Sequence, residues 1–284
     1  MRFATVNGEK READRGLTGI CIGCEQPVIP KCGPIKVKHW AHKSQCECDH
    51  WWENETEWHR SWKDNFPIEC QEIRHRADDG EWHIADVRTK QGHILEFQHS
   101  FLNPTERQAR NKFYGGKLVW VVDGLKRKND LSRFNSLLKN SKLIAQGINL
   151  IRLPTLLDDC PILKEWSECN GPVFFDFGME FPLWCLLPKT SKEAHYIGPF
   201  AHQNFVELHN GLLTQNGQSF SELMNTLNDI VFAYENPQQQ VLRHQSQVQL
   251  PERPIMQRWI TIPPNPSQRY LYRLNHSSRR RGRF

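Results

Sequence analysis

The sequence predicts an α/β protein, in which a mixed sheet carries helices on its faces and follows a small metal-stapled module. Residues 51–153 place apolar runs of strand length between two stretches of helical spacing. Residues 1–50 contain a CxxC and an HxxH, and residues 237–284 are rich in Gln, Pro and Arg. We therefore predict a zinc-ribbon-like module (1–50), a central core (51–153), a C-terminal α+β region (154–236) and a linker with a tail (237–284).

Length and composition are those of a soluble protein with one large or two small domains. The chain has 284 residues, 38% hydrophobic and 24% charged. No apolar run approaches the roughly 20 residues that span a membrane, and the first residues lack the apolar centre of a signal peptide. We expect a cytoplasmic protein without membrane contact.

The positive charge lies at the C-terminal end. The net charge is +5, whereas residues 252–284 alone contain eight arginines and a single acid, Glu252. The rest of the chain is therefore slightly acidic. Such a tail suits a polyanion, above all nucleic acid, although it could merely increase solubility.

The CxxC and HxxH predict a zinc site. Nine cysteines in a chain without a secretion signal favour metal binding over disulfides. Residues 27–38, between the two motifs, read as a hairpin that brings the four side chains together as tetrahedral zinc requires. The predicted ligands are Cys21, Cys24, His39 and His42. Alternatively, the cysteines are core residues and the histidines lie on the surface. A further group could also replace one His: Cys32, Cys46, Cys48 or His50.

A helix over residues 55–63 is predicted to present an acid and an imidazole to the core. Asn54, with Glu57 three residues later, resembles a capping box. Helical spacing places Glu55 and His59 on one face with two tryptophans, Trp58 and Trp62, and turns Glu57 outward. Alternatively, Glu55 complements the helix dipole and His59 is a hydrogen-bonded, partly buried side chain.

The core then continues with three strands, a helix and a strand. The strands are expected at residues 67–75, 82–89 and 93–99, the helix at 103–114 and the last strand at 118–122. Asn103 followed by Pro104 is a typical start of a helix. The order helix, three strands, helix, strand predicts a mixed sheet with helices on its faces.

Two of these strands carry acids where apolar residues are expected. Asp86 lies beside Ala85 and Val87, and Glu96 lies between Leu95 and Phe97. Burying unpaired carboxylates is costly, and a divalent metal ion removes that cost. Asp86 and Glu96 on neighbouring strands suit metal-assisted hydrolysis of a phosphodiester. They could equally be carboxylates on the solvated face of an ordinary hairpin.

Several linked motifs resemble the competence protein CoiA-like nuclease family of the PD-(D/E)xK superfamily. They extend over residues 20–124: the CxxC, the HWAH box, Glu55-Thr56 with His59, His83 to Val87, Glu96 to Ser100, and Trp120 to Gly124. The resemblance implies a restriction-endonuclease-like αβββαβ core and DNA handling in uptake, recombination or defence in a bacterial setting. Gln98 stands where the superfamily most often has Lys, and the resemblance implies that Gln is accepted there.

From this resemblance we expect the following site. Asp86, Glu96 and the Phe97 carbonyl hold Mg²⁺ or Mn²⁺, and Glu55 holds it directly or through water. Gln98 positions the attacking water, and His59 assists proton transfer or binds a phosphate oxygen. His99 points away from Gln98. Arg107, Arg110 and Lys112 either follow the nucleic-acid backbone or form an ordinary solvated helix face.

Residues beyond the core show no chemical motif. We expect a helix over 131–145, strands at 148–153, 172–177 and 183–187, a connection at 154–171, and a helix from a capping box at Ser219 and Glu222 to about Tyr234. Asp176 is interpreted as structural. This region is a candidate surface for a protein partner.

The sequence thus predicts a metal-dependent nuclease with a catalytic Mg²⁺ or Mn²⁺ and a structural Zn²⁺, and DNA is the favoured substrate. The alternative is a catalytically inactive, zinc-containing nucleic-acid-binding protein or scaffold. Divalent-metal-dependent strand cleavage separates the two.

Overall fold

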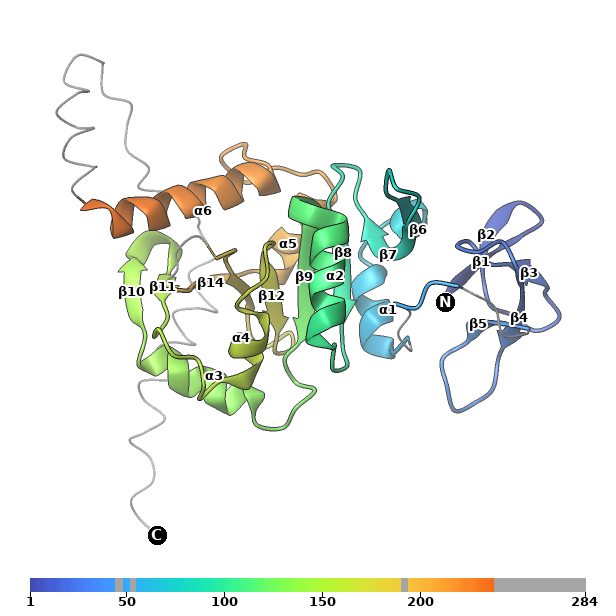
Figure 1. The fold of residues 1–284 in the computed structure, drawn as a ribbon, viewed down its shortest axis with the longest axis horizontal. Coiled ribbons are helices and arrows are strands. Elements are labelled where there is room, and N and C mark those ends of the chain that lie inside the picture. Colours follow the sequence, from blue (N-terminus) through green and yellow to red (C-terminus); the bar gives the residue numbers. More distant parts are fainter. Residues whose placement is uncertain (44–47, 52–54, 190–193, 238–284) are drawn as a thin grey trace, which may run out of the picture. The chain divides into compact units, whose positions relative to one another are not determined.

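The structure is a computed structural model that describes residues 1–43, 48–51, 55–189 and 194–237 (Figure 1). It divides into two compact units, Met1–Val121 and the chain from Val122 onward. Each unit is described by itself. The predicted Gln-rich linker, the Arg-rich tail, Asn54 and Cys46 lie outside the described residues. The predicted domain boundaries therefore stay predictions.

The first unit begins with an antiparallel sheet in the order β2-β1-β3-β4-β5. Its strands are β1 (Phe3–Val6), β2 (Glu9–Glu12), β3 (Gly19–Ile20), β4 (Pro27–Lys31) and β5 (His39–His42). Ala4, Cys21, Val28 and Trp40 form its small core. The expected hairpin is present, but its second strand is the HxxH itself, since Lys31 pairs with His39 and Val28 with His42.

The predicted order of helix, three strands, helix and strand follows. The elements are α1 (Glu57–Lys63), a 3-10 turn (Ile68–Cys70), β6 (Gln71–Arg76), β7 (Trp82–Arg88), β8 (Ile94–Gln98), α2 (Pro104–Tyr114), a 3-10 turn (Gly115–Lys117) and β9 (Leu118–Asp123). In space the strands run β9-β8-β7-β6. The sequence prediction of this order and of α2 with its Asn103 cap is confirmed.

Strand alternation in β8 assigns the two helices to opposite faces of the sheet. The Phe97 ring stacks on Trp62 of α1 at 5.7 Å between ring centroids. The neighbouring Glu96 carboxylate pairs with Arg110 of α2 at 2.9 Å. Because successive side chains of a strand point to opposite sides, α1 covers one face of β8 and α2 the other.

Helix α1 begins later than predicted. Thr56 is its N-cap, and the capping box joins the Thr56 side chain to the backbone N–H of His59 and the His59 ring to the backbone N–H of Thr56. Glu55 therefore precedes the helix and is not part of a helical face. Glu57 is exposed, as expected.

The second unit contains five strands in the order β10-β11-β14-β13-β12. The strands are β10 (Lys142–Ala145), β11 (Leu150–Arg152), β12 (Val173–Asp176), β13 (Leu183–Leu186) and β14 (Tyr196–Phe200). A 3-10 turn (Gln146–Ile148) joins β10 to β11. The helices are α3 (Asp130–Lys139), α4 (Pro161–Trp166), α5 (His202–His209) and α6 (Phe220–Glu235).

Aromatic side chains form the core of this unit on both sides of β12. Phe174 meets Phe205 of α5 at 4.8 Å, whereas its neighbour Phe175 faces Phe134 of α3 at 6.3 Å. Two predictions are wrong here. The helix expected over 131–145 ends at Lys139 and a strand follows, and the connection expected at 154–171 contains α4. The capping box of Ser219 and Glu222 is confirmed.

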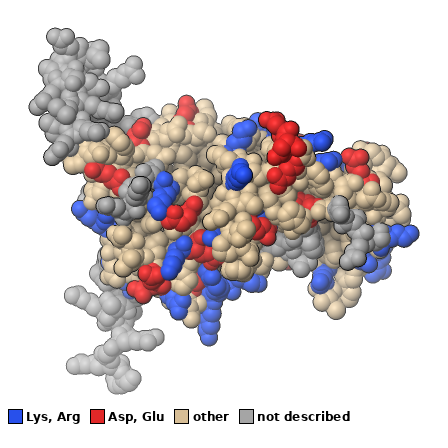
Figure 2. Space-filling model, viewed as in Figure 1, with Lys and Arg blue, Asp and Glu red and all other residues tan. Residues whose placement is uncertain are grey.

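Among the described residues, no helix combines the length and the apolar character needed to cross a membrane. On the face shown in Figure 2, basic and acidic side chains are interspersed.

Candidate metal cluster and acidic site

Four side chains of the N-terminal module gather into a cluster with a metal-binding donor set. One ligand atom of each of Cys21, Cys24, His42 and Cys48 lies within 4.8 Å of the others. The Cys24 Sγ is 3.1 Å from His42 Nε2, and the Cys21 Sγ is 3.8 Å from the Cys48 Sγ. Three thiols and one imidazole are a donor set of structural zinc sites, so the cluster could hold zinc.

His39 is not part of this cluster, and Cys48 takes the predicted place of that ligand. His39 and His42 lie three residues apart on β5, and an odd spacing sends side chains of a strand to opposite faces. His42 shares its face with Trp40, whereas the His39 Nδ1 bonds the Val37 carbonyl oxygen. Cys48 was one of the four alternatives that the spacing left open.

The turn that carries Cys21 and Cys24 packs against β7. The Cys21 N–H donates to the Gln26 carbonyl, and the Glu25 N–H donates to the Cys21 carbonyl. A Cβ on Gly23, between the two cysteines, would lie 2.6 Å from the Trp82 ring and 2.8 Å from Ile84. A hydrogen bond from Cys48 lowers the pKa of the Cys21 thiol to about 4, which favours the thiolate that binds metal.

A cavity of about 270 Å³ adjoins the cluster and contains the acids. It is lined by five carboxylates beside His42 and Cys48: Asp49, Glu55, Glu72, Asp86 and Glu96. The predicted acids of β7 and β8, Asp86 and Glu96, thus line the same cavity as two members of the Cys/His cluster. Lys63 and Arg110 also line it.

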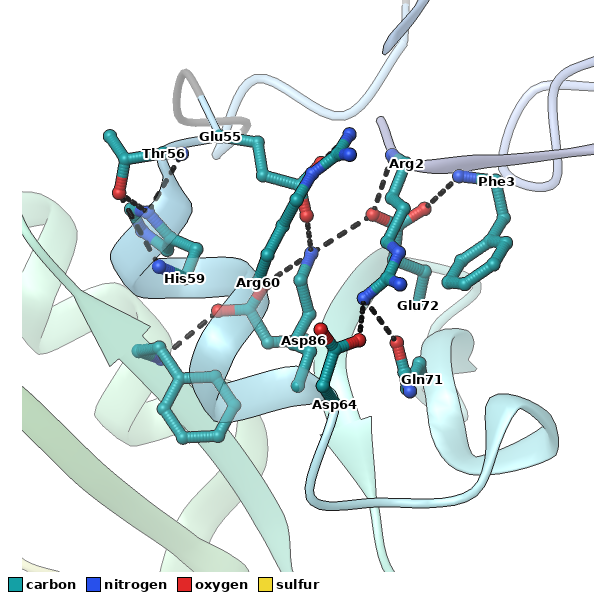
Figure 3. Close-up of polar contacts among 12 residues, drawn as sticks. Arg2, Phe3, Glu55, Thr56, His59, Arg60, Asp64, Gln71, Glu72 and Asp86 are labelled. Carbon is teal, nitrogen blue, oxygen red and sulfur yellow. Dashed lines mark hydrogen bonds and ion pairs between the residues drawn. The ribbon is translucent and has the colours of Figure 1, made fainter. Parts of the chain in front are cut away.

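The ammonium group of Lys63 lies among three of these carboxylates. Its Nζ is 2.6 Å from Glu55 Oε1, 3.0 Å from Glu72 Oε1 and 3.7 Å from Asp86 Oδ1. Figure 3 shows Glu55, Glu72 and Asp86 converging on this point from a loop and two strands. Burial would lower the pKa of Lys63, but Glu72, Asp86 and Glu55 raise it above its ordinary value. Lys63 therefore stays charged.

Glu72 connects the acidic site to the N-terminal sheet. Its carboxylate accepts hydrogen bonds from the backbone N–H groups of Arg2 and Phe3 at 2.8 and 3.0 Å (Figure 3). Burial opposes ionisation, but Lys63 and these N–H groups lower the pKa of Glu72 to about 2. Its backbone φ of 44° lies in the left-handed region, a strain of about 1–3 kcal/mol that the surrounding contacts must hold.

Glu96 is buried against Arg110. One oxygen lies 2.9 Å from the Arg110 guanidinium, and the other, Oε1, is a buried atom without a hydrogen-bond partner among the described residues. Burial, partly opposed by Arg110, raises the pKa of Glu96 to about 8. An orphaned buried carboxylate oxygen is an atom that a bound cation would satisfy.

Asp86 lies where β7 and β8 separate. The two strands pair at Val87 and Arg88 only, and the Asp86 Oδ2 accepts from the backbone N–H of Phe97 at 3.0 Å. The side chain is 26% exposed, the most open of the carboxylates that contact Lys63. It is thus the most solvent-accessible of these three carboxylates.

The structure brings most of the predicted acidic site together. Glu55, His59, Asp86, Glu96 and Phe97 all line the cavity. Gln98 is not among the lining residues, and its amide donates to the Ser100 carbonyl at 3.1 Å. The His59 Nδ1 bonds Thr56 as part of the helix cap. The His99 ring lies 5.9 Å from that of His59, on the α1 side of β8.

The structure corrects the prediction for Arg110 on α2, which was expected to follow the nucleic-acid backbone or to lie on a solvated helix face. It is buried and pairs with Glu96 and Glu106, so it forms no solvated face. Lys112 is exposed and Arg107 is half-buried.

Sequence reasoning missed Lys63, Glu72 and the role of Arg110. One feature could have shown Lys63: it follows His59 by four residues, so it falls on the same face of α1 as the buried His59. A lysine at such a position requires buried anions. In the described part of the chain, the Cys/His cluster is the one group of three or more potential ligands gathered tightly enough to hold an ion. Glu55, Glu72 and Asp86 instead contact Lys63, and Glu96 pairs with Arg110.

Comparison with known proteins adds one match. Residues 8–50 match the family model described as competence protein CoiA, N-terminal domain. No curated protein and no solved structure matches the chain. The matched segment contains all four residues of the Cys/His cluster. It ends before α1, so the assignment of the core to the PD-(D/E)xK superfamily stays a prediction. The match supports the predicted likeness to a CoiA-like family for residues 8–50.

Proposed function

We propose that this protein is a metal-dependent nuclease that hydrolyses phosphodiester bonds, with DNA as the favoured substrate. The observation that carries the proposal is the joint presence of Asp86, Glu96 and Glu55 in one cavity. Two neighbouring strands and the residue before the N-cap of α1 contribute them. The order α1-β6-β7-β8-α2-β9 supports a restriction-endonuclease-like core.

The charge of the cavity favours a divalent cation. Five carboxylates line it, including Asp49, against the two cationic side chains Lys63 and Arg110. The raised pKa of Glu96 favours its neutral form at pH 7, but the other carboxylates still outnumber the two cationic side chains. This excess negative charge and the orphaned Glu96 Oε1 suit Mg²⁺ or Mn²⁺, which prefer oxygen ligands. Asp86, Glu96, the Phe97 carbonyl and Glu55 would hold it.

A divalent ion bound there would polarise a phosphate and lower the pKa of a bound water. The chain's own groups would do the rest. Lys63, beside Asp86, would orient the carboxylates and stabilise negative charge that develops on the phosphate. His59 presents its ring to the cavity and is a candidate for proton transfer. Gln98 is a weaker candidate for positioning water because its amide is directed at Ser100.

The Cys/His cluster would hold a structural zinc ion. The hydrophobic core of the N-terminal sheet is small, so the metal would contribute free energy to its folding. The CoiA N-terminal domain supports a setting in bacterial competence and DNA uptake, recombination or defence, with nucleic acid as the partner and the cytoplasm as the location. A protein partner could bind the second unit.

Cleavage of single- and double-stranded DNA and of RNA tests the proposal. We expect strand breaks that require Mg²⁺ or Mn²⁺ and disappear in EDTA. Asp86→Ala should abolish cleavage while nucleic-acid binding persists, because it removes one metal ligand and leaves the basic side chains of the protein in place. Undiminished cleavage by Asp86→Ala would contradict the assigned roles. Tight, salt-sensitive binding without cleavage of any substrate would favour the inactive binding protein or scaffold.

A further inference from the structure

We propose that Asp49 is a positioning residue that couples the Cys/His cluster to the acidic site. The proposal rests on metal loading of the cluster, one part of the proposed function, and not on nuclease activity. Its basis is the short segment Cys48–Trp51, which contains one member of the Cys/His cluster. The segment contacts His83 of β7 and Arg110, the partner of Glu96 on β8. The cluster would therefore hold the acidic site in shape, in addition to stabilising its own sheet.

The first connection runs from Cys48 through Asp49 to β7. The Asp49 Oδ1 lies 2.7 Å from His83 Nδ1, and the Oδ2 accepts from the backbone N–H of Ile84 at 2.7 Å. Ile84 lies beyond the residues of β7 that pair with β8, so Asp49 supplies an acceptor outside that ladder. Ile84 and Asp86 are two residues apart, so their side chains share a face of β7, and both line the cavity.

The second connection runs from Trp51 to Glu96. The Trp51 carbonyl accepts a hydrogen bond from Arg110, whose guanidinium also pairs with Glu96 at 2.9 Å. The Trp51 ring stacks on His83, the partner of Asp49. The segment thus fixes the backbone beside Asp86 and the cation that faces Glu96.

The cysteine turn adds a third contact to the same strand. Gly23 approaches Trp82 and Ile84 so closely that only a residue without Cβ fits there. Cys21, Cys24, Cys48 and Ile84 belong to one packed cluster. Metal ligation would fix Cys48 relative to Cys21 and Cys24, and therefore fix Asp49 against β7.

Amide hydrogen exchange of the full-length protein tests the coupling without reference to cleavage. The samples are zinc-loaded wild type, wild type treated with a zinc chelator, and zinc-loaded Asp49→Ala. Zinc content is measured in each, and peptides that cover β7 and β8 are compared. Asp158→Ala is the matched control, since Asp158 is an exposed acid whose partner is Lys164. Peptides of α6 report whether the rest of the chain stays folded.

We expect chelation to raise exchange in β7 and β8 of the wild type by about tenfold or more, because a hydrogen bond to a charged group protects a backbone N–H more than a bond between neutral groups does. Asp49→Ala should show the same rise while it still contains zinc, and chelation should add little further. Asp158→Ala should match the wild type. Wild-type protection of β7 and β8 in zinc-loaded Asp49→Ala would overturn the proposal, as would unchanged protection after chelation.

The nuclease proposal can fail separately. Coupled exchange in a protein that cleaves no substrate would leave the positioning role standing and remove the nuclease. If cleavage needs Asp86 but chelation leaves exchange in β7 and β8 unchanged, the nuclease proposal stands and the positioning role is contradicted. An Asp49→Asn variant, which keeps the shape and one acceptor oxygen, should give an intermediate rise. A rise in Asp49→Asn as large as in Asp49→Ala together with loss of α6 protection would show general unfolding and contradict a local role.

Discussion

Lys63 is buried to 97% of its side-chain surface, among carboxylates that the sequence places far apart in the chain. An ammonium buried alone would lose its charge, and the carboxylates alone would be protonated. Together they form an ion network whose members depend on one another. Removing one member of such a buried network leaves uncompensated charges behind.

Lys63→Met should therefore destabilise the protein by about 3–5 kcal/mol, although methionine preserves much of the packing volume. Lys164→Met removes an exposed pair with Asp158 and should cost less than about 1 kcal/mol. Urea unfolding of both variants checks this. Equal, small losses would show that the buried network contributes nothing to stability.

Glu72 predicts how stability depends on pH. Its folded pKa of about 2 lies below the ordinary value of 4.5, so its contribution is fully present above pH 4.5 and is lost as the pH falls toward 2. Glu72→Gln should be less stable than the wild type at pH 6 and should lose less stability on acidification over this window. Chemical unfolding at several pH values measures both slopes, and parallel slopes would contradict the assignment.

The composition of the Cys/His cluster predicts which single substitutions reduce zinc binding. Cys48→Ser should lose the bound zinc or weaken its affinity strongly, because it removes one of four clustered donors. His39→Ala should retain one equivalent, since His39 faces the other side of β5. Metal analysis of the purified variants decides between Cys48 and His39. Loss of zinc in His39→Ala alone would restore the ligand set that the sequence motif suggested.

At the scale of elements, secondary structure explains which ligands the sequence could identify. The CxxC pair lies in a turn, where two residues of spacing bring both thiols together, and it was predicted correctly. The HxxH pair would converge on a helix, but on β5 its members diverge. Cys48 lies behind residues 44–47, and no local periodicity indicates that it returns to the cluster.

The elements of the core were easier to predict than their ends. Asn103 and Pro104 fix the start of α2, whereas the N-cap of α1 is Thr56 and not the predicted Asn54. Leu143 and Ile144 fit a helix or a strand, and pairing of β10 with β11 decides for the strand. The six-residue α4 was missed because so short a helix leaves little periodic pattern.

The contact of the cysteine turn with β7 gives a prediction for this element. Gly23→Ala would place a Cβ within 3 Å of two side chains and should destabilise the first unit by about 1–3 kcal/mol. Gly33→Ala has open space around its Cβ and should change stability little. Thermal or urea unfolding, with zinc present, compares the two. A neutral Gly23→Ala would mean that the turn and β7 do not pack as described.

At the scale of the whole molecule, the first unit contains both the segment that matches the CoiA N-terminal domain and the acidic cavity. The sequence indicated both parts but not their contacts, because pairs such as Arg2 with Glu72 or Asp49 with Ile84 join residues far apart in the chain. It indicated Asp86 and Glu96 because acids interrupt apolar strands. It could not indicate that Lys63 and Arg110 contact them, since that depends on how the helices pack.

Metal-dependent cleavage by two glutamate variants tests the central claim most directly. Glu96→Ala removes a cavity carboxylate, whereas Glu57→Ala removes an exposed carboxylate on α1 as a matched control. The purified proteins are incubated with DNA and Mn²⁺ or Mg²⁺, and product lengths are measured over time. We predict metal-dependent cleavage by the wild type and by Glu57→Ala, and none by Glu96→Ala. Equal cleavage by Glu96→Ala and the wild type, or cleavage that persists in EDTA, would contradict a metal-dependent nuclease at this cavity.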